Sequence, residues 1–146
     1  MSKKLLAAVA LLLTGYAVGR VSSSPVSAQA TTTAAAGHVY ELRTYTAAEG
    51  KISNVQARFR DHTLRIFAKH NMKSVGYWTP LEGPTADTTL VYILEHPSRE
   101  EARKNWAAFS ADPEWVKVKT ESEVGGRIVA KAESVFLNPT DYSPLK

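Results

Sequence analysis

The stretch Val39-Tyr40-Glu41-Leu42-Arg43-Thr44-Tyr45-Thr46 decides the fold, because its side chains alternate with a period of two. In this pattern Glu41, Arg43 and Tyr45 share one face of the chain. Such alternation is typical of a β-strand whose two faces meet different surroundings. We therefore expect the folded part of the chain to begin at this strand and to be built on a sheet.

A long amphipathic helix is expected directly after this strand, from near Ala48 to a left-handed stop at about Asn71. With about 3.6 residues per turn, its apolar side chains gather on one stripe, and Arg58 falls on the opposite face with Asp61 and Arg65. The stripe consists of Ile52, Val55, Phe59, Ile66 and His70, with Thr63 alongside.

The rest of the chain predicts three more strands and two more helical segments. Ser98 and Glu101 have the spacing of a capping box that starts a helix, and Asp112-Pro113 restarts one. This order is the ferredoxin-like βαββαβ order of an α+β fold, with a four-stranded antiparallel sheet and the helices on one face. The later strands are expected at residues 74–81, 89–96 and 127–137.

Both faces of the predicted sheet carry large apolar side chains. Val75 and Tyr77 point one way and Trp78 the other, while Tyr92 opposes Val91 on the neighbouring strand. A solvated sheet face would be polar, and a monomer would expose more apolar surface than soluble proteins tolerate. We therefore expect the open faces of two sheets to pair in a twofold-symmetric homodimer.

The chain resembles the NIPSNAP family at three motifs, which are the run Tyr40–Tyr45, the strand Val75-Gly76-Tyr77-Trp78 and the helix start Asp112-Pro113-Glu114-Trp115. The resemblance extends from about Val39 to Pro139. It implies a dimeric α+β barrel related in fold to the antibiotic-biosynthesis monooxygenases. It implies no well-defined reaction.

The N-terminus has the pattern of an export signal. Lys3 and Lys4 precede an apolar run, Leu5–Leu13, that is short for a membrane span, and Ala28-Gln29-Ala30 supplies small residues for a signal peptidase. We predict a periplasmic or secreted protein, cleaved near Ala30 and not stably inserted in a membrane afterwards; the alternative is an uncleaved N-terminal membrane anchor. The expected divisions are a signal peptide at 1–30, a flexible tether at 31–37, the folded domain at 38–139 and a tail at 140–146.

The composition excludes several classes of partner and chemistry. Lys3, Lys4 and Arg20 carry three of the four net positive charges, so the mature chain has no basic surplus that would bind nucleic acid. Because the chain has no cysteine, thiolate nucleophiles, cysteine-ligated zinc and iron–sulfur clusters are excluded. We predict no cofactor and no metal site, since the histidines have no recognisable ligand spacing.

A ligand pocket is expected between the first helix and the sheet. Glu41 and Arg43 could form a buried polar pair that lines it; the alternative is an ion pair at a sheet surface or dimer interface. Aromatic neighbours could wall the pocket, although such residues are more often core or interface. The candidate pocket residues are Glu41, Arg43, Tyr45, Phe59, His62, Tyr77, Tyr92 and Trp106.

His62 is the candidate proton acceptor or ligand donor, because it lies at the edge of the helical stripe. A packed histidine with one hydrogen bond is the simpler interpretation. His70 would cap the last helical turn, and His38 and His96 flank strands and should be solvated. Haem held by His62 or His70 is a further option at the level of the fold.

Two functions of different classes follow. The first is non-catalytic binding of a small apolar ligand, or of an envelope partner, by an exported homodimer. The second is a cofactor-free monooxygenase or isomerase that acts on a small aromatic substrate. That enzyme would need a proton acceptor in the pocket, and only His62, Glu41 and the tyrosines qualify. We favour the first function, because the second rests on fold analogy alone.

Overall fold

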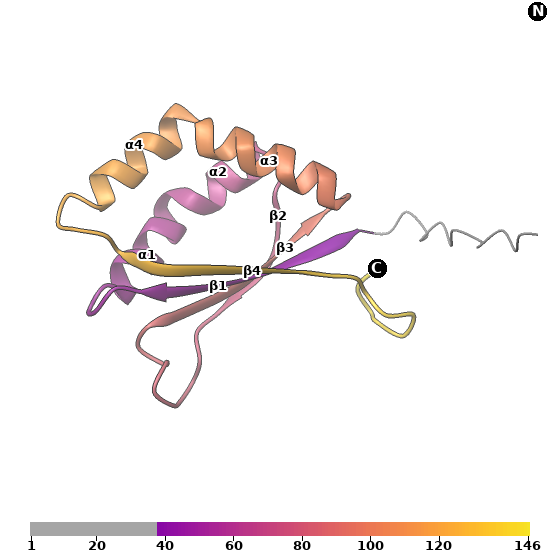
Figure 1. Cartoon of the computed structure of the whole chain (residues 1–146), viewed down its shortest axis with the longest axis horizontal. Helices are drawn as coiled ribbons and strands as arrows, with labels where there is room; N and C mark the ends of the chain where they lie inside the picture. Colours follow the sequence, from indigo (N-terminus) through magenta and orange to yellow (C-terminus); the bar gives the residue numbers. More distant parts are fainter. Residues whose placement is uncertain (1–37) are drawn as a thin grey trace, which may run out of the picture. The chain divides into compact units, whose positions relative to one another are not determined.

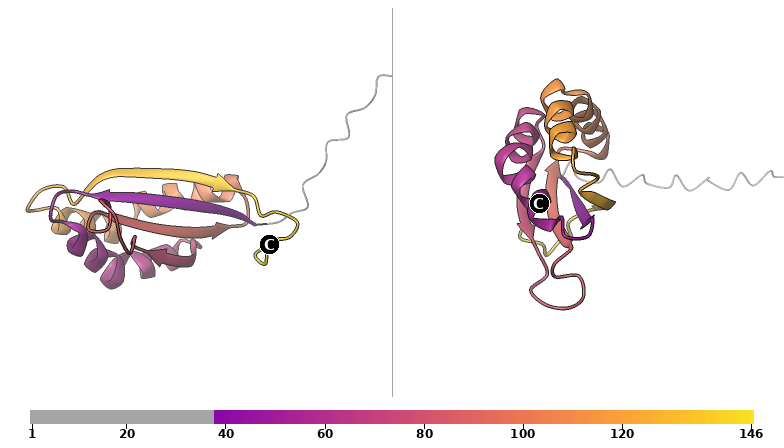
Figure 2. Two further views of the ribbon diagram at one scale, coloured as in Figure 1. Left: turned by 90° about the horizontal axis from the view of Figure 1, so that it is seen from below. Right: turned by 90° about the vertical axis from the view of Figure 1, so that its left-hand side faces the viewer.

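The computed structural model describes residues 38–146, which form a four-stranded antiparallel sheet with helices on one face (Figure 1; Figure 2). This arrangement confirms the predicted α+β fold and its βαββαβ order. The predicted export signal and tether lie outside the described residues. The strands are β1 (Val39–Ala47), β2 (Lys73–Trp78), β3 (Thr89–His96) and β4 (Val129–Leu137), in the spatial order β2-β3-β1-β4. The helices are α1 (Ile52–Arg58), α2 (Leu64–Lys69), α3 (Arg99–Ala111) and α4 (Pro113–Ser122), and a π-helical turn, η1 (Phe59–Thr63), joins α1 to α2.

Local signals set the helix ends. Gly50 has a φ of 66°, so the chain turns before α1 and the helix begins at Ile52, four residues later than Ala48. The predicted stop at Asn71 is confirmed by its φ of 55°. The Ser98 hydroxyl accepts a hydrogen bond from the Glu101 amide at 3.1 Å, as the capping box predicts. At the start of α4, the Asp112 carboxylate accepts from the Glu114 amide at 2.8 Å.

The hydrophobic core lies between the helices and the sheet. The predicted stripe of the first helix supplies buried side chains to this core, and β3 supplies the opposite wall. On β4, by contrast, Ala132 and Ser134 are exposed, so the helices leave this edge of the sheet open. The largest core side chains are Phe59, Ile66, Phe67, Met72, Tyr92, Leu94 and Phe109.

The other face of the sheet is uncovered by any helix (Figure 2). Leu42 on β1 lies opposite Ile93 on β3 and Val135 on β4. Val135 is 54% exposed and Trp78 is 50% exposed. A Cβ on Gly76 would lie 2.6 Å from the Trp78 ring, so the indole lies flat against the sheet only because this position is glycine. We call this surface the open face.

Two sequence predictions about the elements were wrong. β2 ends at Trp78 rather than near Leu81, because Pro80 has no amide hydrogen to donate to the sheet and the chain leaves it; Leu81 is 98% exposed. Arg58 does not lie on a solvated face but is 5% exposed. The periodicity of the helix placed Arg58 opposite the face that packs on the sheet. The structure shows that α1 also packs against α4, which buries this second face.

Within residues 38–146, no helix is long and apolar enough to cross a membrane.

Candidate functional site

A buried carboxylate, that of Glu41 on β1, lies at the centre of a polar network. It is 1% exposed. Its Oε1 accepts hydrogen bonds from Arg43 Nη1 at 2.9 Å and from Ser134 Oγ at 2.6 Å. Its Oε2 accepts from Trp106 Nε1 at 2.6 Å and from His96 Nε2 at 3.1 Å. These five residues, from three strands and α3, are called the carboxylate network.

The hydrogen bonds of the network keep Glu41 ionised. Burial alone would raise the pKa of this carboxyl, but the donors on His96, Ser134, Trp106 and Arg43 outweigh burial and lower the pKa to about 2. Because the carboxylate is ionised at neutral pH, His96 Nε2 carries the proton that it donates. Glu41 is therefore held by four donors and is poorly suited to accept a proton from a substrate.

A chain of aromatic rings runs from the network across the sheet to β2. The Arg43 guanidinium lies 4.4 Å from the centre of the Trp106 ring, and its Nη2 donates to the Tyr45 hydroxyl at 3.3 Å. Tyr45 meets Tyr92 edge to face, with 5.3 Å between ring centroids. Tyr92 in turn stacks on Tyr77 at 5.5 Å. The polar network and the aromatic core are thus one packed unit.

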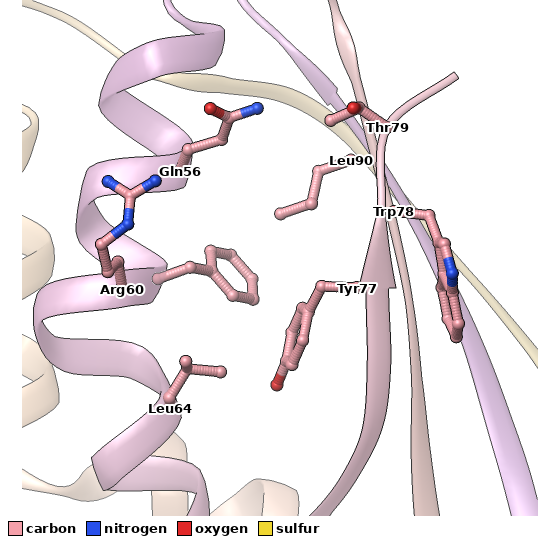
Figure 3. A pocket seen from close by; sticks show the side chains of 8 residues that line it. Gln56, Arg60, Leu64, Tyr77, Trp78, Thr79 and Leu90 are labelled. Atoms are coloured by element: carbon pink, nitrogen blue, oxygen red, sulfur yellow. The ribbon is translucent and has the colours of Figure 1, made fainter. Parts of the chain in front are cut away.

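A cavity of about 350 Å³ opens at the far end of this chain of rings (Figure 3). Figure 3 shows Tyr77 and Leu90 pointing from the sheet towards the helix, and Leu64 and Gln56 pointing back from the helix. Burial raises the pKa of the Tyr77 hydroxyl, which shares a hydrogen bond of 2.6 Å with Ser74. We call this space the aromatic cavity; it is lined by Gln56, Phe59, Arg60, Leu64, Tyr77, Trp78, Thr79 and Leu90.

The structure brings together seven of the eight candidate pocket residues. Five of these seven belong to the network or touch it, and Phe59 and Tyr77 line the aromatic cavity. That they bind a ligand stays a prediction. The five are Glu41, Arg43, Tyr45, Tyr92 and Trp106.

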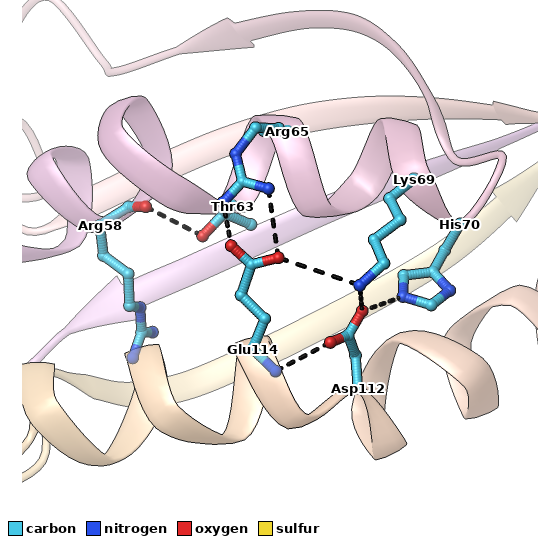
Figure 4. Close-up of polar contacts among 7 residues, drawn as sticks. All are labelled: Arg58, Thr63, Arg65, Lys69, His70, Asp112 and Glu114. Carbon is cyan, nitrogen blue, oxygen red and sulfur yellow. Dashed lines mark hydrogen bonds and ion pairs between the residues drawn. The ribbon is translucent and has the colours of Figure 1, made fainter.

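His62 does not lie between the helix and the sheet. It is exposed, and it borders a groove on the α4 side with Asn54 and Glu121. The reason is η1: a π-turn holds more residues than an α-turn, so it rotates His62 away from the sheet. Thr63 Oγ1 closes this turn by donating to the Arg58 carbonyl at 3.1 Å (Figure 4).

Sequence reasoning missed two members of the network. His96 was expected to be solvated, yet it is fully buried. Its position in the alternation Leu90, Tyr92, Leu94, His96 of β3 was the available signal, since all four share one face. Ser134 lies opposite Arg43 in the pairing of β1 with β4. Its place in the alternation along β4 was the corresponding signal.

Neither His62 nor His70, the two histidines considered for haem, lines the aromatic cavity. His70 Nε2 lies 2.6 Å from Asp112 Oδ2, and Lys69 Nζ approaches the same oxygen at 2.7 Å (Figure 4). His70 therefore joins α2 to the start of α4, and His62 faces solvent. Across the described residues, no group of three or more histidine or acidic side chains is placed to hold a metal ion.

Comparison with known proteins gives one family. The NIPSNAP family model matches residues 40–144. A comparison with curated proteins finds no match.

Solved structures of the same fold come from several bacteria. A NIPSNAP family protein of unknown function from Agrobacterium tumefaciens is 26% identical, with 77% of this chain and 96% of that chain covered and a TM-score of 0.66. An uncharacterised NIPSNAP-like domain protein from Burkholderia xenovorans is 19% identical, with 76% and 93% covered and a TM-score of 0.64. SnoaB from Streptomyces nogalater, a cofactor-independent oxygenase, is 17% identical, with 75% and 99% covered and a TM-score of 0.50. At these identities, the last two proteins show a similarity of fold to this chain and no more.

Proposed function

The chain belongs to the NIPSNAP family, and from that premise we propose that it is a homodimeric domain that binds a small apolar molecule, without catalysis, in the aromatic cavity. The observation that carries the proposal is the chemistry of the lining. Its ionisable members are Arg60 and Tyr77. A guanidinium group is not deprotonated in proteins, and burial raises the pKa of the Tyr77 hydroxyl, which therefore stays protonated at neutral pH. No residue that lines the cavity can therefore accept a proton from a ligand.

The lining also indicates what kind of molecule would fit. Phe59, Leu64, Tyr77 and Leu90 offer aromatic and aliphatic surface, and a volume of about 350 Å³ lies in the range of small-molecule sites. Gln56 and the hydroxyls of Tyr77 and Thr79 are neutral polar groups at the walls (Figure 3). A flat aromatic molecule with one neutral hydrogen-bonding group satisfies both features.

The homodimer is part of the proposal because of the open face. Leu42, Ile93 and Val135 form a contiguous apolar surface across three strands, with Trp78 at the β2 edge. Soluble proteins seldom expose such a surface in isolation. A second copy, related by a twofold axis, presents the same surface and would cover it.

The neutral aromatic alcohol 1-naphthol is a suitable probe for the aromatic cavity. We expect saturable binding to the wild-type protein by calorimetry, and at least tenfold weaker binding to Leu64→Trp, because Leu64 is 37% exposed and a larger ring there would fill the cavity without disturbing the core. Leu81→Trp adds the same ring at a position that is 98% exposed and away from the cavity, so it should bind like wild type. Equal binding by all three proteins would contradict the proposed site.

The oxygenase or isomerase alternative has a distinct outcome in the same experiment. The proposal expects 1-naphthol to be recovered unchanged after prolonged incubation in air with the protein. A protein-dependent product, absent with Leu64→Trp, would instead support cofactor-independent oxygenation, the activity of SnoaB. Native mass spectrometry of protein purified from its own envelope would distinguish a retained small molecule from a protein partner.

The proposal also includes export of this protein and removal of its signal peptide. Lys3, Lys4, the short apolar run and Ala28-Gln29-Ala30 support cleavage after Ala30. N-terminal sequencing of the natively expressed protein should therefore begin at Thr31. An intact N-terminus on membrane-bound material would favour the anchor.

A further inference from the structure

A second cavity, of about 290 Å³, lies between α4 and the exposed edge of the sheet. We call it the basic cavity, because four basic side chains and one acidic side chain line it. Tyr45, on its wall, contacts Phe59 of the aromatic cavity edge to face at 5.8 Å, so packed rings separate the two spaces. The charged lining residues are Arg58, Lys119, Glu123, Arg127 and Lys131.

The positive charge at the mouth of this cavity is not neutralised. Arg58 donates to Glu123 at 3.1 Å, and Lys131 pairs with Glu133 at 2.8 Å. Within residues 38–146, no carboxylate lies within ion-pair distance of Lys119 or Arg127. Two exposed cations therefore border the cavity without a carboxylate partner in the described residues.

The deepest cation in the basic cavity is Arg58, whose side chain is 4% exposed. Its Nε has no hydrogen-bond partner in the described part of the chain. Its Nη1 donates to Glu123 Oε1 at 3.1 Å and to Ser122 Oγ at 3.2 Å. Arg58 is thus screened from solvent, and the exposed side chains of Lys119 and Arg127 are the cations that a ligand in the cavity could reach.

The rest of the lining is apolar. Trp115 stacks on the Arg58 guanidinium at 5.3 Å, and Val129, Ala130 and Ala132 of β4 form the opposite side. A small inorganic anion would leave this surface unused, whereas an anion with an apolar body would cover it.

We propose that the basic cavity binds an amphipathic monocarboxylate, with its apolar body between Trp115 and β4 and its carboxylate paired with Lys119 and Arg127. Two flexible cations match one carboxylate group, and the acidic Glu123 disfavours a more highly charged anion such as a phosphate ester. This site lies outside the aromatic cavity and does not depend on the function proposed for it.

The carboxylate analogue of the first probe, 1-naphthoate, tests this site. Binding is measured by calorimetry in the Leu64→Trp background, so that the aromatic cavity does not contribute. We expect the doubly substituted Lys119→Gln/Arg127→Gln protein to bind at least tenfold more weakly, and added salt to weaken binding to the unsubstituted cavity. Lys117→Gln is the matched control, because Lys117 is exposed on the same helix and pairs with Glu121 outside the cavity.

Several results would overturn the site. One is equal affinity of the double variant and the Lys117→Gln control. Another is binding of neutral 1-naphthol as tight as that of 1-naphthoate in the same background, which would show that the charge is not recognised. Displacement of 1-naphthoate by millimolar inorganic phosphate would indicate a general anion site instead. Each of these results concerns the basic cavity alone and does not affect the binding of 1-naphthol to the wild-type protein. The two proposals are therefore tested separately.

Discussion

Replacing Glu41 by glutamine is expected to lower the free energy of unfolding by about 3 kcal/mol, because the change removes a buried charge that pairs with the half-buried guanidinium of Arg43. Glutamine keeps one acceptor but turns its amide hydrogens towards Trp106, His96, Ser134 or Arg43, all of which donate to the carboxylate. At least one buried donor then faces another donor. Chemical denaturation of both proteins measures the difference.

A matched substitution separates this effect from a general loss of negative charge. Glu121→Gln lies on α4, where the Glu121 side chain is 64% exposed and pairs with Lys117 at the surface. It should change the free energy of unfolding by less than about 0.5 kcal/mol. Similar effects for the two variants would mean that the carboxylate network does not stabilise the fold.

The same pair of proteins has an expected pH dependence. The pKa of Glu41 is lowered from 4.5 to about 2 in the folded chain. A lowered carboxyl pKa contributes stability that is complete above the unfolded value and is lost as the pH falls through the folded value. The difference in stability between wild type and Glu41→Gln should therefore be constant above about pH 5 and shrink between pH 4.5 and 2.

Introducing a charge on the open face is expected to dissociate the proposed dimer. Val135→Glu would bury an unpaired carboxylate in each copy of a twofold interface, which costs several kcal/mol, so the dissociation constant should rise at least about 100-fold. Val135 is 54% exposed in the single chain, so the variant should fold normally. Sedimentation velocity at micromolar concentration should show a dimer for wild type and a monomer for the variant.

The control for this substitution is Val124→Glu. Val124 is 85% exposed in the turn after α4 and does not belong to the sheet, so this variant should remain dimeric. A wild-type protein that sediments as a monomer at the same concentration would contradict the dimer itself.

The sequence predicted those features that depend on period and local capping. Alternation in Val39–Thr46 placed Glu41, Arg43 and Tyr45 on one face, and these side chains do meet in the carboxylate network. The caps at Ser98 and Asp112 depend on atoms within one turn of the helix, and both are present. Such signals act over a few residues and are therefore visible in a single sequence.

The remaining features depend on contacts between distant segments. Arg58 is buried because α4 packs against α1. Its hydrogen bond to Ser122 joins residues that are 64 positions apart in the sequence. The π-turn at Phe59–Thr63 turns His62 away from the sheet. A helical wheel of constant period cannot represent such a turn. His96 seemed solvated because it ends a strand, yet the carboxylate of Glu41, 55 residues earlier, accepts its hydrogen bond.

The central claim, that the aromatic cavity binds a small apolar molecule, is tested most directly by mapping 1-naphthol onto the folded protein by NMR. The account predicts saturable shifts of backbone amide resonances that cluster around Phe59, Leu64, Tyr77 and Leu90, which line the cavity. Saturable shifts confined to the open face around Leu42, Ile93 and Val135, or no saturable shifts at millimolar 1-naphthol, would contradict it.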